Sequence, residues 1–112
     1  MNQPKWTIAI FSSRESVSVL QSCIDATLKA SYGATVTIDV LVNGNYRLAE
    51  DISKCQMHEG GNALLRIWFI PLGDKAHTWN QYMRYIWQES DIAYFIDGYV
   101  LLNSNALMLI NE

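Results

Sequence analysis

Four short runs of apolar residues recur along the chain. They occupy positions 6 to 11, 36 to 42, 64 to 70 and 92 to 96, and each is rich in Ile, Val, Leu and aromatic residues. Apolar runs of this length, bounded by polar or glycine-containing segments, are typical of strands that are buried on both faces. We therefore predict four buried β-strands.

The interval between the first two runs predicts a helix. Its apolar residues recur at helical spacing, at Val17, Leu20, Ile24 and Leu28. Ser12 and Glu15 stand before them in the register of a capping box, and Gly33 follows as a stop signal. We expect the helix to lie between these signals.

Weaker helical patterns lie in the later intervals and at the end of the chain. The second interval has Leu48, Ile52 and Cys55 at helical spacing, and the third has Trp79, Met83, Ile86 and Trp87. The third pattern predicts a helix over 75 to 88, and a fourth helix could begin at Ser104 or Asn105. The large side chains of this half could form a platform on which a sugar stacks, but we expect them to be core and packing residues, namely Trp79, Tyr82, Met83, Trp87 and Tyr94.

Strands and helices therefore alternate along the sequence. This order builds a three-layer α/β domain with helices on both faces of a mostly parallel sheet, because each right-handed crossover carries a helix. Asn43 and Gly44 could instead form a two-residue hairpin turn. The residues after them, 46 to 54, carry charges at helical spacing and do not alternate, so we predict a crossover helix and no hairpin.

The size and charge of the chain limit its function. Its 112 residues fit a single domain, 1–112, and 50% hydrophobic with 17% charged residues is ordinary globular usage. The formal net charge is -3 and no cluster of Lys or Arg occurs, which argues against a nucleic-acid partner. An anionic ligand would need a local cation or a metal ion.

Cysteine usage and the N-terminus bear on the cellular compartment. Cys23 and Cys55 fall in helical patterns without a CxxC or a His pair, so we expect two reduced thiols in the core. The apolar run from Trp6 to Phe11 is too short for a signal peptide or a membrane span. We expect no membrane span in this chain and a cytoplasmic location.

Open parallel sheets bind ligands beyond the carboxyl ends of their strands. Here those positions hold Ser12, Ser13, Arg14 and Glu15, then Asn43, Gly44 and Asn45, then Gly73, Asp74, Lys75 and His77, then Asp97, Gly98 and Tyr99. No GxGxxG and no GxxxxGK[ST] occurs, which removes the common dinucleotide and P-loop sites. The lack of a phosphate loop and an acidic cluster after the first strand also disfavours a flavodoxin-like or receiver-like domain.

Four collinear segments resemble the motifs of one enzyme family. Residues 8–14, IAIFSSR, are similar to a first strand with a P-T-Y-N-R turn, and residues 40–44, VLVNG, to a second strand ending in D-D-G, without the Pro and both acids. Residues 72–76, LGDKA, with Asn80, are similar to an N-x-G-x-x-x-A-R-N helix opening. Residues 94–99, YFIDGY, resemble F-L-D-A-D, the DxD motif, and residues 105–107 resemble the P-x-x-L region after it. These motifs are those of GT-A glycosyltransferases of the family 2 type.

The resemblance, which covers nearly the whole chain, implies a fold and an activity. The fold is that of nucleotide-diphospho-sugar transferases, with strand order 3-2-1-4, so that the ends of the first and fourth strands lie side by side. The activity is the binding of a nucleoside diphosphate sugar and the transfer of its sugar to an acceptor that the sequence does not identify. The chain would be the N-terminal, donor-binding part of a longer glycosyltransferase.

The matched positions imply contacts with the nucleotide. Phe11, Ser12 and Asn43 match strand ends that contact the base, and the Asn43 amide offers a uracil edge both a donor and an acceptor. The alternative is that Asn43 is a turn residue before Gly44.

The diphosphate side of the site would be lined by basic residues. Arg14, Lys75 and His77 could stabilise the charge of the leaving group as its bond to the sugar breaks. The alternative is that Arg14 and Lys75 are solvated at helix starts and that His77 is a surface or capping residue.

The metal site of the resembled family is only half present. Asp97 matches the first carboxylate of DxD, near the ribose and a bound Mn²⁺ or Mg²⁺. Tyr99 stands where the second carboxylate would be, and a phenol is a poor ligand for these cations, so Tyr99 argues against metal dependence. The alternative is that Asp97 is a turn residue bonded to backbone amides.

Sugar transfer with inversion also needs a carboxylate base. In the family the base and the acceptor site follow the DxD motif, and this sequence ends at Glu112, so we expect no transfer by the chain alone. It would be a truncated enzyme or a small relative that binds without transferring. A noncatalytic binding or interaction domain is the alternative function. Apolar surface left uncovered near the fourth strand would favour a homo-oligomer.

Overall fold

The computed structural model describes residues 5–31, 33–56 and 63–102, and within them the predicted α/β alternation is confirmed. The elements are β1 (Lys5–Ser12), α1 (Val17–Ala30), β2 (Thr35–Asn43), α2 (Tyr46–Lys54), β3 (Ala63–Ile70), α3 (Lys75–Gln81), the π-helical turn η1 (Tyr82–Ile86) and β4 (Ile92–Asp97). The helix expected from Ser104 or Asn105 and the resemblance at 105–107 fall outside the described residues.

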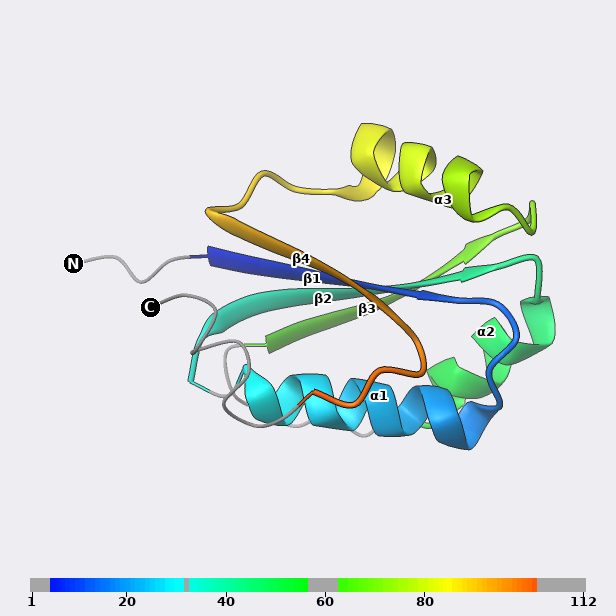
Figure 1. Ribbon diagram of the computed structural model, residues 1–112, viewed down its shortest axis with the longest axis horizontal. Coiled ribbons are helices and arrows are strands. Elements are labelled where there is room, and N and C mark those ends of the chain that lie inside the picture. The colour runs from blue at the N-terminus through cyan, green and yellow to red at the C-terminus, as the bar shows by residue number, and fades with distance from the viewer. Residues whose placement is uncertain (1–4, 32, 57–62, 103–112) are drawn as a thin grey trace.

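The four strands form one parallel sheet in the order β3-β2-β1-β4. This confirms the predicted strand order. β2 runs parallel to both of its neighbours, so Asn43 and Gly44 form no hairpin, as predicted. Helices α1 and α2 cover one face of the sheet, and α3 with η1 covers the other, which gives three layers (Figure 1).

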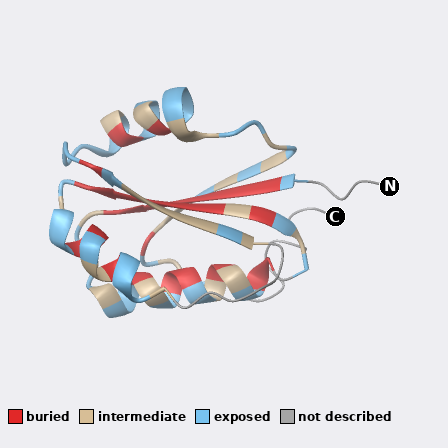
Figure 2. Cartoon of the chain, turned by 180° about the vertical axis from the view of Figure 1, so that it is seen from behind, coloured by how far each residue is buried: buried red, intermediate tan, exposed pale blue. Residues whose placement is uncertain are grey.

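Burial is concentrated in the two inner strands, β1 and β2, whereas β3 and β4 at the edges are partly exposed (Figure 2). The larger core lies beneath α1 and α2 and includes Ile8, Ile10, Leu20, Ile24, Ile38, Val40 and Ile52, all fully buried. A smaller cluster of Ala9, Phe11, Leu41 and Tyr82 lies on the opposite face, beneath α3 and η1. Because strand side chains alternate between faces, each inner strand contributes to both cores.

Helix α1 begins later than the predicted capping box. Its N-cap is Ser16, whose side chain accepts a hydrogen bond from the Val19 N–H, whereas Ser12 is still part of β1. The Ser12 hydroxyl donates instead to the Glu15 carboxylate at 2.7 Å. The capping-box prediction was wrong because β1 pairs with β2 as far as Ser12, which keeps that residue extended.

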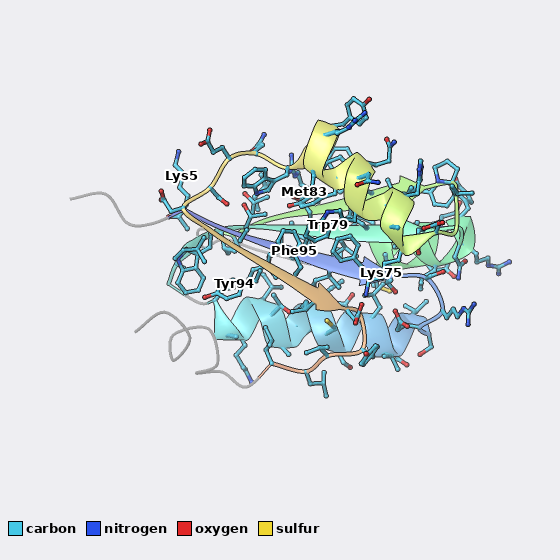
Figure 3. All side chains as sticks on the ribbon, turned by 45° about the horizontal axis from the view of Figure 1, so that its top comes forward. Lys5, Lys75, Trp79, Met83, Tyr94 and Phe95 are labelled. Atoms are coloured by element: carbon cyan, nitrogen blue, oxygen red, sulfur yellow. The ribbon has the colours of Figure 1, made fainter. Side chains whose placement is uncertain are left out.

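The third helical segment is shorter than predicted and less buried. It ends at Ile86 and not at Gln88, because Trp87 has extended backbone angles that lead toward β4. Tyr82 is fully buried, but Trp79 and Met83 are 40% and 36% exposed, so their assignment to the core was wrong. Trp79 packs against Phe95 of β4, and Met83 lies near both (Figure 3). Among the described residues β4 is an edge strand that pairs only with β1, so no further strand covers this side.

The two thiols differ, in contrast to the expectation of two core cysteines. Both are free, but Cys23 is buried in α1 and Cys55 is exposed at the end of α2. Burial raises the pKa of the Cys23 thiol to about 11. In the part of the chain that the structure describes, no helix is long and apolar enough to cross a membrane.

Candidate functional site

The sheet has a topological switch point at the carboxyl ends of β1 and β4. The chain leaves β1 through α1 toward β2 on one side, and reaches β4 on the other side through α3, which covers the opposite face. The two crossovers diverge and leave a crevice between these strand ends, which is where ligands bind in open α/β sheets. Phe11 and Asp97 are register partners there, so the predicted proximity of the first and fourth strand ends is confirmed.

A hollow of about 220 Å³ occupies this crevice. Its lining consists of Phe11, Ser12, Ser13, Arg14, Glu15, Asn43, Gly73, Lys75, Asp97 and Tyr99. The structure thus brings together seven of the residues selected from the sequence as ligand contacts: Phe11, Ser12, Arg14, Asn43, Lys75, Asp97 and Tyr99. It does not bring His77 into this lining; the His77 backbone N–H donates to the side chain of Asp74, the N-cap of α3. The volume is below the roughly 300–1,000 Å³ of common ligand pockets, so the hollow is small for a whole drug-sized ligand.

Two glycines allow the loops around the hollow to approach closely. A Cβ at Gly98 would lie 2.9 Å from Glu15 Oε1 and 3.0 Å from Ser12 Cβ. Gly44 has φ of +69°, and a Cβ there would lie 2.7 Å from Gly73 Cα. A side chain at either position would therefore push apart the loops that shape the hollow.

Asn43 places a largely buried amide at the hollow. It is the last residue of β2, is 6% exposed, and its side chain makes no hydrogen bond within the described residues. The turn is made by other residues, because Gly44 carries the positive φ, and Asn45 caps α2 and donates to the Ser13 carbonyl. Neither polar atom of the amide belongs to the fully buried atoms that lack a partner, so the amide is accessible from the hollow. Asn43 thus has a donor and an acceptor free for a ligand.

Asp97 forms a small polar cluster with Lys75 and Tyr99. Lys75 Nζ lies 2.5 Å from Asp97 Oδ1, and the Tyr99 hydroxyl donates to Asp97 Oδ2 at 3.4 Å. The cluster is accessible, with 65% of the Lys75 side chain and 36% of the Asp97 side chain exposed. The following turn is closed by a backbone bond, from the Val100 N–H to the Asp97 carbonyl, so the carboxylate itself is not used to cap it.

The other charged residues of the hollow are Arg14 and Glu15. Arg14 is exposed and takes part in no salt bridge among the described residues, while Glu15 accepts the hydrogen bond from Ser12. Two cations and two carboxylates therefore line the hollow. Within residues 5–31, 33–56 and 63–102, no group of three or more His, Cys, Asp or Glu side chains is arranged to hold a metal ion.

A buried charge network on the α3 face was missed by the sequence analysis. Asp39, in the middle of β2, is fully buried and accepts hydrogen bonds from Arg66 Nε at 2.7 Å and Nη2 at 3.0 Å, Trp68 Nε1 at 3.0 Å and the Tyr82 hydroxyl at 2.9 Å. Burial, and then the Asp39 charge, raise the pKa of Tyr82 above its ordinary value. The sequence carried one signal for this network, because Asp39 and Arg66 each interrupt an otherwise apolar strand pattern.

An aromatic cluster connects this network to the hollow. The Phe11 ring, which lines the hollow, lies 6.4 Å from the Tyr82 ring edge-to-face and 6.1 Å from the Trp79 ring. Trp79 in turn lies 4.4 Å from Phe95 of β4. Figure 3 shows Lys75, Trp79 and Met83 along the helical segment above β4, with Phe95 beside them. The wall of the hollow near Phe11 is therefore supported by packing from η1.

No family model, no curated protein and no solved structure matches this chain. The structure itself supports a small Rossmann-like α/β domain with a four-stranded parallel sheet.

Proposed function

We propose that the hollow binds the nucleotide part of a nucleoside diphosphate sugar, and that the chain is the donor-binding domain of a glycosyltransferase related to the family 2, GT-A type. The observation that supports this proposal best is the convergence of the seven sequence-selected residues on one hollow at the switch point of the sheet. These residues come from four separate stretches of the chain, which the parallel sheet brings together at the carboxyl ends of its strands.

The lining offers two kinds of contact. Phe11 and the amide of Asn43 offer an apolar surface with one donor and one acceptor, which suits a nucleobase edge. Arg14 and Lys75 offer positive charge, which suits a diphosphate. A volume of about 220 Å³ leaves the sugar outside the hollow, where the acceptor would approach.

Calorimetric titration tests this assignment. We expect at least one of UDP, GDP, ADP and CDP to bind the 112-residue chain, with UDP preferred if Asn43 contacts uracil. Asn43→Leu keeps a similar volume and breaks no protein hydrogen bond, so it should leave stability nearly unchanged while weakening binding about tenfold, the equivalent of one good hydrogen bond. Failure of all four nucleotides to bind would refute the proposal.

A noncatalytic interaction domain is the second candidate. The exposed apolar side chains beside the β4 edge favour it: Trp79, Met83 and Phe95 are 40%, 36% and 36% exposed, and such patches often mark protein contacts. Nucleotide binding distinguishes the two functions. A donor-binding domain should bind UDP more tightly than uridine, whereas an interaction domain should bind neither.

A further inference from the structure

The resembled family implies a Mn²⁺ or Mg²⁺ ion at Asp97, and the donor set here does not fit one. These cations need several oxygen ligands, usually including carboxylates. Among the described residues of the lining, the carboxylates are Asp97 and Glu15. Both oxygens of Asp97 are engaged, by Lys75 and Tyr99, and Oε1 of Glu15 is bonded to Ser12.

The position of the ion is instead approached by an ammonium group. Lys75 is the first residue of α3 and reaches across to the end of β4, where its Nζ meets Asp97 at 2.5 Å. An ammonium group has three N–H donors. One is used by Asp97, so two remain for oxygens of a ligand in the hollow. The Lys75 side chain is 65% exposed to solvent, so a ligand can reach these donors.

We propose that Lys75 takes the place of the divalent cation, so that the hollow binds the diphosphate of its ligand without a metal ion. Asp97 acts here as a positioning residue that holds the ammonium at the carboxyl end of β4. This inference rests on the proposed function, and it concerns how the diphosphate is neutralised.

The charge balance of the hollow limits how much Lys75 can contribute to the binding of a diphosphate. Because two carboxylates offset the two cations of the lining, the hollow attracts a diphosphate through the placement of Lys75 and Arg14 more than through net charge. Lys75 should therefore contribute one charge-assisted interaction. Its loss should weaken binding of a nucleoside diphosphate about ten- to a hundredfold.

The test compares a nucleoside diphosphate with its nucleoside. UDP and uridine are titrated by calorimetry, once with EDTA and once with MnCl₂, against the unmodified chain, Lys75→Ala and Lys75→Arg. We expect UDP to bind equally well with EDTA and with manganese. Lys75→Ala should weaken UDP and leave uridine unchanged, and Lys75→Arg should retain most of the UDP affinity. Lys54→Ala, which removes an exposed lysine of the surface pair with Glu50, is the matched control and should change neither affinity.

The role of Asp97 is tested with a double substitution. If Asp97 positions Lys75, Asp97→Asn should weaken UDP but not uridine, and Lys75→Ala with Asp97→Asn should be no weaker than Lys75→Ala alone. Weakening of uridine by Asp97→Asn would instead indicate a direct contact with the ribose and would overturn the positioning role.

The outcomes separate the two proposals. UDP binding that requires manganese would overturn the metal-free inference and leave the nucleotide site standing. Equal weakening of UDP and uridine by Lys75→Ala would show a structural role for Lys75 and would also overturn it. Absence of binding by UDP, GDP, ADP, CDP and uridine under both conditions would refute the proposed function and the inference with it.

Discussion

The buried carboxylate of Asp39 provides a direct test of the fold energetics. It accepts four hydrogen bonds, two from Arg66 and one each from Trp68 and Tyr82. Asp39 is fully buried on the face of β2 that α3 and η1 cover. Asp39→Asn keeps the size and shape of the side chain. It removes the negative charge, and it replaces one acceptor oxygen with an NH₂ group that cannot accept from Arg66.

The expected loss of stability follows from the burial of the pair. Removing one partner of a buried ion pair costs about 3–5 kcal/mol, because the remaining charge has no counter-charge. The Arg66 side chain is 22% exposed, so water relieves a part of this penalty. We expect Asp39→Asn to lower the free energy of unfolding by roughly 2–4 kcal/mol, which for a domain of this size corresponds to a fall in Tm of about 10–20 °C.

Urea and thermal unfolding at pH 7, followed by circular dichroism, measure this loss. Arg66→Met added to Asp39→Asn should recover part of the stability, because it removes the unpaired guanidinium. Asp51→Asn is the control: it breaks an exposed pair with Arg47 and should change stability by less than about 1 kcal/mol. A change for Asp39→Asn as small as that of the control would refute the reasoning.

Other predictions concern pH, metal, thiols and association. The raised pKa of Tyr82 contributes stability that is complete below the ordinary tyrosine pKa of about 10 and is lost as pH rises above it, so Tyr82→Phe should lose less stability between pH 8 and 11 in urea unfolding. Equal losses would contradict this. Tyr99→Asp adds a carboxylate and should make UDP binding depend on manganese in calorimetry; no dependence would show that the DxD match is misplaced. Ellman's reagent at pH 8 should modify Cys55 quickly and Cys23 only after unfolding, since Cys23 is buried and its pKa is about 11. Sedimentation velocity should show self-association that Phe95→Lys abolishes by charging the β4 edge; a monomeric unmodified chain would contradict this.

Much of the fold could be predicted from the sequence because its signals are local. The four apolar runs correspond to β1, β2, β3 and β4, and the charged residues after Asn43 correctly indicated a crossover helix in place of a hairpin. Helix ends were less predictable. Ser16 caps α1 because pairing between β1 and β2 extends through Ser12, and such pairing is a property of the sheet.

The candidate site was predictable in its membership but not in its contacts. Polar residues that follow parallel strands must gather at one edge of the sheet, so the sequence alone placed Asn43 and Asp97 among the candidates. The Lys75–Asp97 contact joins residues 22 positions apart, and it required the path of α3 over the sheet. Only the tertiary structure shows that the Asn43 side chain has no hydrogen-bond partner in the described part of the chain.

The Asp39 network was decided by tertiary structure alone. In sequence, Asp39 and Arg66 interrupt two apolar runs that are 27 positions apart, and nothing local relates them. The register between β2 and β3 places them directly opposite each other, and the π-helical turn brings Tyr82 over the same carboxylate. The hydrophobic periodicity of a segment depends on which of its side chains are buried. It therefore determined whether each segment forms a strand or a helix, and which of its faces is buried. Strand register and helix placement follow from contacts between distant segments, and these decided which buried charges are paired and which polar groups remain free for a ligand.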